Sequence, residues 1–239
     1  NSRIGNSFET TLDEIFEVDR FLKYLAVEAL VGHWDGYSYN QNNFYLYENP
    51  ETNKVEFIPY DVDNTFGINW IQRDWGTRDV LSWPISGQDR PLVKKVLERP
   101  RYFNRYVSEI RKLLNSDFSE SELFPVFDSH QLMLSDAVRN DDYFPLTFGF
   151  SFEDFENSYT ESVADHLPYG LKPYVTARVN SAREQISNVV TSIENPTGDV
   201  SLHPNPNNGK QLFISGLRPT DHLRIVDLSG RRYEFMRTF

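Results

Sequence analysis

Two short polar segments of the chain hold the residue types that could do chemistry. Residues 33–43 have the sequence HWDGYSYNQNN and residues 57–67 have the sequence FIPYDVDNTFG. In an extended strand, Asp61 and Asp63 would project from the same face, because side chains alternate along a strand. Paired carboxylates with nearby carboxamide oxygens suit a hard cation such as Mg²⁺ or Mn²⁺. The two segments therefore indicate a site for a divalent cation.

The acidic pair also has simpler interpretations. A single Asp or Asn in a loop most often caps a helix or forms a turn. Against this, an apolar strand seldom runs into two acids that lack a partner, because an unpaired carboxylate is costly to remove from water. A calcium loop of the EF-hand type is excluded, since its sixth and twelfth positions are Phe66 and Gln72 instead of Gly and Glu. A glycoside hydrolase that uses Asp35 and Asp61 as its carboxylate pair stays compatible with the spacing.

The first segment matches the spacing of a protein-kinase catalytic loop. That loop has the pattern H-R-D-x-x-x-x-N, in which the Asp acts as base and the Asn binds metal, and a hairpin leading to D-F-G follows it. His33, Asp35 and Asn40 have this spacing. Such a short pattern occurs by chance, so most of its weight comes from the hairpin that leads on to Asp61.

Apolar periodicity predicts the elements that must position these residues. A helix is expected over residues 19–33, with Asp19 as its N-cap and Gly32 at its end. Strands are expected over residues 44–47 and 55–63, with a turn between them. Further helices are predicted over residues 92–97, 100–114 and 121–138, from a capping box at 151–154, and over 171–193.

These elements predict an α+β fold that is mostly helical and carries its site on a β-hairpin. Residues 195–199, with the sequence NPTGD, predict a linker. Short apolar stretches at 212–214 and 223–226 then predict a small β module. We therefore expect two domains, residues 1–194 and residues 195–239.

Composition narrows the class of protein. The 239 residues carry a net charge of −11 at pH 7, which disfavours nucleic acid or an anionic membrane as a partner. The chain has no Cys, so disulfides and thiolate chemistry are excluded. No apolar run approaches the roughly 18 residues of a membrane span. The chain begins at Asn1 without Met, which predicts a piece of something longer.

A longer pattern resembles a known family. It consists of LAVE at residues 25–28, the Asp35-Gly36 loop, NNFYLY at 42–47 and the segment 57–67. With these motifs the chain resembles the spore-coat CotH kinase family, over roughly residues 8–193. The resemblance implies an atypical protein-kinase-like fold, of which this chain would be the C-lobe. It also implies an enzyme that transfers phosphate from ATP, with Mg²⁺ or Mn²⁺, to Ser or Thr of secreted or surface proteins.

The resemblance implies roles for individual residues. Asp35 would be the catalytic acid or base, and Asp61 would bind the metal, with Asp63 close behind it. Two candidates stay open for the metal-binding Asn. The spacing from Asp35 favours Asn40, whereas the position at the start of the strand favours Asn43.

A kinase also needs an N-terminal lobe with a nucleotide-covering loop and a phosphate-binding Lys. In this family resemblance those parts would lie before Asn1, and no Gly-rich loop is visible in the chain. We therefore expect this lobe to be catalytically incomplete by itself. A cell-surface binding or structural module that keeps the fold without activity is the alternative.

Two motifs near the C-terminus resemble the sorting domain of type IX secretion. They are LHPNPNNG at residues 202–209 and LRIVDLSGR at residues 223–231. The resemblance implies a partial β-sandwich that engages the secretion machinery, and an extracellular or cell-surface location. The alternative is a small β appendage that stabilises the main domain.

Other aromatic and charged residues support weaker hypotheses. Three Trp could form a sugar-stacking platform, although buried positions in the loop are favoured: Trp70, Trp75 and Trp83. Three Arg could bind phosphate, although pairing with surface acids is favoured: Arg73, Arg78 and Arg90. Four scattered His lack metal-ligand spacing and are assigned no role: His130, His166, His203 and His222.

Overall fold

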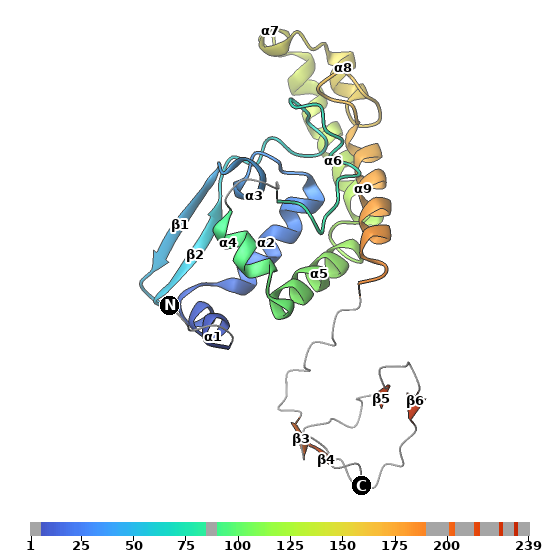
Figure 1. Ribbon diagram of the computed structural model, residues 1–239. Helices are drawn as coiled ribbons and strands as arrows, with labels where there is room; N and C mark the ends of the chain where they lie inside the picture. The colour runs from blue at the N-terminus through green and yellow to red at the C-terminus, as the bar shows by residue number, and fades with distance from the viewer. Residues whose placement is uncertain are drawn as a thin grey trace. The chain divides into compact units, whose positions relative to one another are not determined.

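The computed structural model describes residues 6–84 and 90–189, together with the backbone of four short strands between residues 201 and 233 (Figure 1). The chain divides into two units, residues 1–191 and 192–239. The predicted boundary between residues 194 and 195 lies outside the described residues. In its described residues the first unit combines helices with a β-hairpin, which confirms the α+β class.

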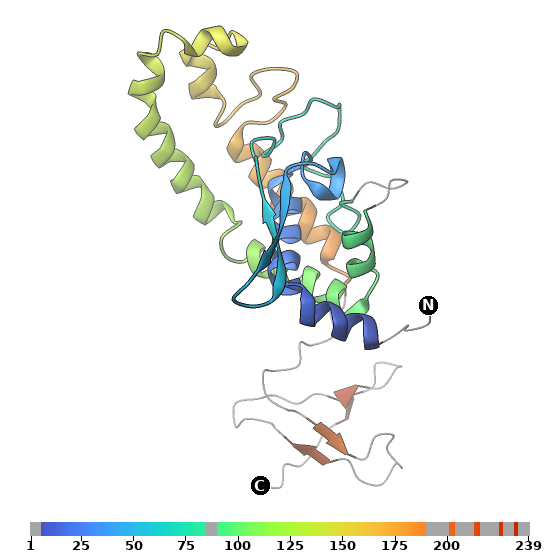
Figure 2. The same ribbon diagram turned by 90° about the vertical axis from the view of Figure 1, so that its left-hand side faces the viewer.

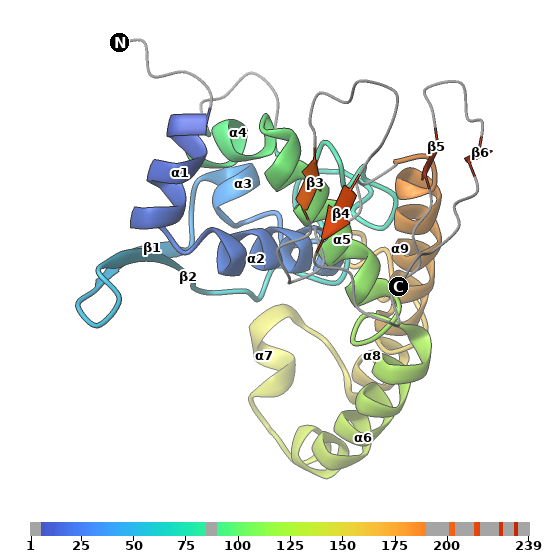
Figure 3. The same ribbon diagram turned by 90° about the horizontal axis from the view of Figure 1, so that it is seen from below.

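The described elements of the first unit follow one another in this order: α1 (Asn6–Ile15), α2 (Val18–Val31), α3 (Tyr37–Asn40), β1 (Phe44–Asn49), β2 (Lys54–Pro59), α4 (Pro91–Leu97), α5 (Pro100–Leu114), α6 (Glu120–Arg139), α7 (Phe144–Phe148), α8 (Phe152–Asn157) and α9 (Leu171–Ile186). Helix α2 is the centre of this unit. It contacts α5, α9 and β2, and Figure 3 shows it between the hairpin and α5. The predicted helix over residues 19–33 is therefore confirmed, with its last residue at Val31 instead of residue 33.

The prediction for the C-terminal end of α2 is confirmed, whereas the prediction for its N-cap is not. Gly32 ends the helix in the left-handed region, with φ of 73°, and a Cβ at this position would lie 2.3 Å from Tyr174 Oη. Only Gly fits both conditions. The prediction of Asp19 as N-cap was wrong, because the helix begins at Val18 and Asp19 lies in its first turn. There the carboxylate forms an ion pair with Arg105 at 2.5 Å.

Strands β1 and β2 form an antiparallel hairpin that packs one face on α2. Phe44 lies opposite Pro59 in the register, and the buried Phe57 stacks on Phe44 with ring centroids 5.3 Å apart. The predicted second strand was too long, since β2 ends at Pro59 instead of residue 63. The backbone of Asp61 has φ of 46°, which a β-strand does not allow. Asp61 and Asp63 therefore lie in a loop, and the argument from strand alternation does not apply to them.

The later helices match their predictions with small shifts of their ends. The capping box is confirmed: Ser151 Oγ accepts from the Asp154 N–H, and the Asp154 carboxylate accepts from the Ser151 N–H at 2.7 Å. Helix α9 ends at Ile186, so its predicted continuation over residues 187–189 was wrong, and 190–193 lie outside the described residues. Helix α6 extends away from α2 and α5, with α7 and α8 toward its far end (Figures 1 and 2).

The second unit is described only as strand backbone. Strand β3 (Ser201–His203) pairs antiparallel with β4 (Phe213–Ser215), and β5 (Ile225–Val226) pairs antiparallel with β6 (Arg232–Tyr233). The strands β4 and β5 overlap the predicted apolar stretches.

Across the described residues, no helix has both the length and the apolar character that crossing a membrane requires.

Candidate functional site

Asp35 is held by the two Asn residues that the sequence left as alternatives. It lies between α2 and α3 and is partly buried. Asn40 Nδ2, at the end of α3, donates to Asp35 Oδ1 at 2.5 Å, and Asn43 Nδ2, just before β1, donates to Oδ2 at 3.0 Å. Each carboxylate oxygen thus has one carboxamide donor, which fixes its orientation. Both carboxamides keep an oxygen that can accept or bind a cation.

The loop after β2 returns to the same place. The Tyr60 N–H donates to the Asn43 carbonyl at 3.0 Å, so the two polar segments are joined through their backbones. Further along, Asn64 Nδ2 donates to Asp63 Oδ1 at 2.8 Å, and the Thr65 N–H donates to the Asp63 carbonyl at 2.9 Å. The side chains of Asp61 and Asp63 are exposed. Both acids are therefore accessible to a ligand in solution.

His33 is a buried imidazole within electrostatic range of three of the acids. Its imidazole is 1% exposed, and neither ring nitrogen has a hydrogen bond of good geometry to the residues that the structure describes. Burial lowers the pKa of His33, and the backbone of Asn64 and the negative charges of Asp35, Asp63 and Asp61 oppose this shift. Three acids from two separate segments thus act electrostatically on one buried imidazole. Of the predicted site residues, Asn40 and Asn43 contact Asp35 directly, and Asp61 and Asp63 act on the same His33 imidazole as Asp35 does.

The backbone of the two segments is strained. Gln41, Asn43, Asp61 and Phe66 all have left-handed φ angles, between 46° and 58°. This conformation costs about 1–3 kcal/mol at a residue other than Gly, and it tends to occur at functional sites. At Phe66 it is maintained by a 2.7 Å hydrogen bond from the Phe66 N–H to the Val31 carbonyl. Tertiary contacts, and not local preference, therefore set the shape of the site.

Two buried Arg residues hydrogen-bond to the backbone of the helices that carry the site. Arg90 is 2% exposed and donates to the carbonyls of Tyr37 and Tyr39 in α3, at 3.0 Å for the Tyr37 bond. Arg178 is fully buried and donates to the carbonyl of Ala29 at the end of α2. The favoured prediction for Arg90, pairing with surface acids, was wrong, because its guanidinium lies in the core. The guanidinium hydrogen-bonds to the backbone of α3 instead.

The remaining Arg and Trp residues with a predicted role are partly buried in the fold and partly exposed. Arg78 donates to the carbonyl of Trp83 at 2.8 Å, so surface pairing was wrong for this Arg as well, whereas Arg73 is exposed. Trp75 and Trp83 are 0% and 1% exposed, which confirms their interpretation as buried residues. Trp70 is 52% exposed and stacks on His166 with ring centroids 4.1 Å apart. Its prediction as a buried residue was wrong.

The site lacks a ready-made metal cage of acids. Within the described residues, no group of three or more His, Asp or Glu side chains is arranged to hold a metal ion. A cation bound by Asp61 and Asp63 would need further oxygens from the Asn carboxamides, water or a ligand. Hard oxygen donors of this kind fit Mg²⁺, which usually keeps several waters and shares its remaining positions with phosphate oxygens.

Sequence reasoning missed the polar cluster beneath α3. Glu28 of α2 is 1% exposed, accepts from Ser38 Oγ, and accepts from Tyr24 Oη at 3.0 Å. A signal was present, because Glu28 interrupts the apolar face of the helix between Leu25 and Ala29. An acid at such a position is either paired or functional.

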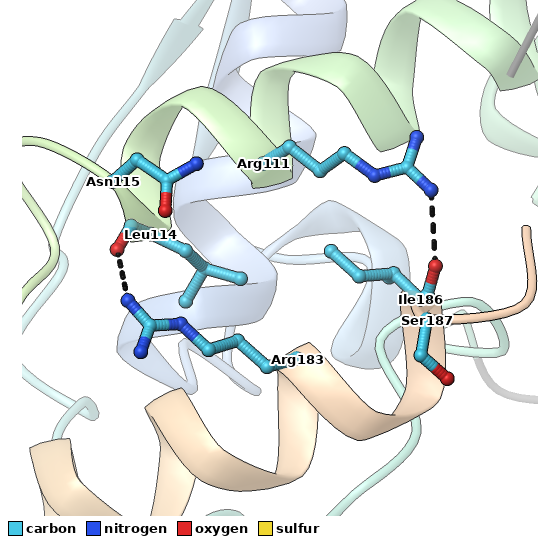
Figure 4. Close-up of a pocket in the computed structure, with 6 residues that line it drawn as sticks. All are labelled: Arg111, Leu114, Asn115, Arg183, Ile186 and Ser187. Carbon is cyan, nitrogen blue, oxygen red and sulfur yellow. Dashed lines mark hydrogen bonds between the residues drawn. The ribbon is translucent and has the colours of Figure 1, made fainter.

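A separate pocket lies where α5 and α9 end (Figure 4). Its volume is about 160 Å³, and its lining includes two Arg residues. Arg183 donates to the Leu114 carbonyl at 2.9 Å, and Arg111 donates to the Ile186 carbonyl at 3.0 Å. Each helix thus supplies the Arg that caps the C-terminus of the other, as the dashed lines in Figure 4 show. This pocket is structural and contains none of the predicted site residues.

Comparison with known proteins places these features in a family. Residues 2–181 match the family described as "CotH kinase protein". The chain is 22% identical to invasin CotH3 of Rhizopus delemar over 216 residues, which are 83% of this chain and 35% of the relative. It is 27% identical to inner spore coat protein H of Bacillus subtilis over 119 residues, which are 49% of this chain and 31% of the relative.

These matches cover most of the first unit but only part of each relative. The aligned region spans about a third of the length of these curated relatives. The family match runs through both polar segments, α3, the hairpin and most of α9. It covers well over half of the chain and includes Asp35, Asn40, Asn43, Asp61 and Asp63. The chain therefore belongs to the CotH kinase protein family.

Proposed function

We propose that this chain is the C-lobe of a kinase-like phosphotransferase, which transfers a phosphoryl group from ATP to Ser or Thr of secreted or surface proteins. One observation carries the proposal. Asp35 is oriented by two carboxamides and shares its surroundings with Asp61 and Asp63. A phosphotransferase needs a carboxylate for the acceptor hydroxyl beside a metal-binding set, and these groups match that requirement.

The proposed roles follow from the positions of the groups. The oxygen of the acceptor hydroxyl bonds to the γ-phosphorus of ATP, and the bond from that phosphorus to the ADP oxygen breaks. Asp35 accepts the proton that the hydroxyl loses. Asn40 and Asn43 orient Asp35 through their amide groups. Asp61 and Asp63 would hold a divalent cation, with a carboxamide oxygen as a further ligand. When bound, the cation supplies charge neutralisation for the phosphates.

The proposal also covers the location of the protein and the role of its second unit. The relatives are named as invasins and as a spore coat protein, which supports an extracellular or surface location for this chain. We also propose that the second unit is a type IX sorting domain that engages the secretion machinery, on the motifs at residues 202–209 and 223–231. A fusion of residues 192–239 to a reporter, expressed in a bacterium with this system, tests the second point. A reporter that stays in the periplasm would refute it.

A second candidate is a binding module without activity. It is favoured by the arrangement of the possible metal ligands, since the described residues contain no group of three acidic or His side chains that could hold a metal ion. In this case Asp35 would be a structural residue that holds the Asn40 and Asn43 side chains. The two candidates differ in whether nucleotide binding depends on a divalent cation.

A calorimetric titration with ATP, with and without Mg²⁺ or Mn²⁺, separates the candidates. We expect metal-dependent binding that weakens in the variant Asp61→Asn. Asp136→Asn, which removes an exposed acid on α6, is the matched control and should bind as the wild type does. The titration is run on the 239-residue chain and on the protein as its gene encodes it. Absence of metal-dependent binding in both would overturn the kinase proposal and favour the binding module.

A further inference from the structure

Glu28 is an ionisable residue in the core that the proposed chemistry does not use. Its side chain points from α2 toward α3 and is 1% exposed. Its two oxygens accept from Ser38 Oγ, from the Ser38 N–H at 3.4 Å and from Tyr24 Oη at 3.0 Å. Burial and the neighbouring carboxylate of Glu28 raise the pKa of Tyr24, so its hydroxyl remains a donor. Two of the three donors belong to Ser38, in the middle of α3.

The chain passes unusually close to this carboxylate. A Cβ at Gly36, the N-cap of α3, would lie 2.4 Å from Glu28 Oε1 and 2.9 Å from Tyr24 Oη. Any other residue at this position would displace either α3 or the side chains of Glu28 and Tyr24. Gly36 therefore permits the close approach that the Glu28–Ser38 contact needs.

Burying the Glu28 carboxylate costs more free energy than burying an apolar side chain at this position would. No Lys or Arg is among the groups that interact with its carboxylate in the described structure. A buried carboxylate without a cation partner is less favourable than an apolar side chain of similar size. A Leu or Met would serve the core better, so the carboxylate points to a role that packing does not provide.

That role is suggested by what α3 carries. The helix has four residues, too few to be stable without tertiary contacts. Its last residue, Asn40, donates from its backbone N–H to the Gly36 carbonyl at 2.9 Å and from its side chain to Asp35. A displacement of α3 therefore changes the orientation of Asp35.

Helix α3 is held from two sides by groups of opposite character. Glu28 accepts hydrogen bonds from the donors of Ser38, whereas Arg90 donates to the carbonyls of Tyr37 and Tyr39. Directional bonds of both kinds fix the position of a short helix in a way that apolar contacts do not.

We propose that Glu28 is a positioning residue for phosphotransfer: its hydrogen bonds to Ser38 fix α3, so that Asn40 holds Asp35 in its reactive orientation. The proposal rests on the proposed function. It concerns kcat and not the binding of ATP, because Glu28 is buried behind α3 and does not reach the exposed side of the site.

The test uses two variants that each remove one side of the contact. Ser38→Ala deletes the hydroxyl donor, and Glu28→Gln keeps the shape of the side chain but removes its charge. Ser158→Ala is the matched control, because Ser158 Oγ makes one comparable bond to the Phe155 carbonyl in α8. Phosphotransfer is measured with the protein as its gene encodes it. Hydrogen exchange of the Asn40 N–H is measured with the 239-residue chain.

We expect both variants to stay folded and to lose at least about tenfold in kcat, with the affinity for ATP changed by less than about twofold. Exchange of the Asn40 N–H should become at least about tenfold faster, because α3 opens more often. The Ser158→Ala control should match the wild type in both measurements. Glu28→Ala should be worse than Glu28→Gln, since Gln still accepts one bond.

The outcomes separate the two proposals. Wild-type kcat in both variants of the Glu28–Ser38 contact would overturn the positioning role and leave the kinase function standing. If the wild-type protein transfers no phosphate, the proposed function is overturned, and the exchange of the Asn40 N–H still decides whether Glu28 fixes α3. Unchanged exchange in Ser38→Ala refutes that; faster exchange supports it.

Discussion

Replacing Glu28 by Gln should change how the stability of the first unit depends on pH. Burial raises the pKa of Glu28 from its ordinary value of 4.5 to about 7, and the hydrogen bonds from Ser38 and Tyr24 offset only part of this shift. The folded state therefore binds a proton at pH values where the unfolded state has released it. The stability contributed by this proton is complete below pH 4.5 and is lost as pH rises through about 7.

The expected magnitude follows from the size of the shift. Each pKa unit corresponds to about 1.4 kcal/mol, so the free energy of unfolding of the wild type, relative to Glu28→Gln, should fall by about 3 kcal/mol between pH 4.5 and pH 8.5. Gln does not titrate, so the variant lacks this contribution at every pH. Relaxation of the site and entry of water would reduce the observed fall, which makes this value an upper limit.

The assay is denaturant unfolding of both proteins at several pH values, with the difference in free energy plotted against pH. The difference removes the contributions of other groups, including His33, whose lowered pKa gives a dependence of the opposite direction. A difference that is flat within about 0.5 kcal/mol would refute a buried carboxylate without a cationic partner at position 28. A difference that rises with pH would mean that Glu28 has a cationic partner in the folded state.

Three further predictions address the site and the core. Asp35→Ala should lower phosphotransfer by about a thousandfold in the protein as its gene encodes it, while leaving it folded, and retained transfer would remove Asp35 from the reaction. Asp61→Asn should weaken metal-dependent binding of ATP by about tenfold, and an unchanged affinity would transfer the role to Asp63. Arg178→Met should destabilise the fold by about 3 kcal/mol in denaturant unfolding, because it leaves buried carbonyls without donors. Arg183→Met, at an exposed position, should cost less than about 1 kcal/mol, and equal effects of the two would contradict this account.

Features that depend on neighbouring residues were predictable from the sequence. The apolar period identified α2, and the end of this helix followed from Gly32. The capping box at Ser151 and Asp154 is equally local, since both bonds form within one helical turn. The hydrogen bond between Asn40 and Asp35 is also local, since the two lie five positions apart and one short helix joins them, but the sequence predicted their spacing and not this bond.

Features that depend on distant contacts were not predictable. The sequence after Pro59 has alternating apolar and acidic residues and favours a continued strand. The strand stops because Asp61 takes a left-handed conformation, in a loop that Tyr60 and Phe66 join to other parts of the site through backbone hydrogen bonds. Arg178 donates to Ala29, 149 residues away, and no local pattern distinguishes it from a surface Arg.

The choice between Asn40 and Asn43 as the metal-binding residue was open in the sequence and stays a prediction. Spacing favoured Asn40 and strand position favoured Asn43, and in the structure both donate to Asp35, one to each oxygen. A carboxylate with two fixed donors cannot rotate freely, so its orientation depends on the position of both donors. Asn43 is positioned by the Tyr60 N–H, whereas Asn40 depends on α3. The buried Glu28 beneath that helix is therefore where a change outside the site should reach the Asp35 carboxylate most directly.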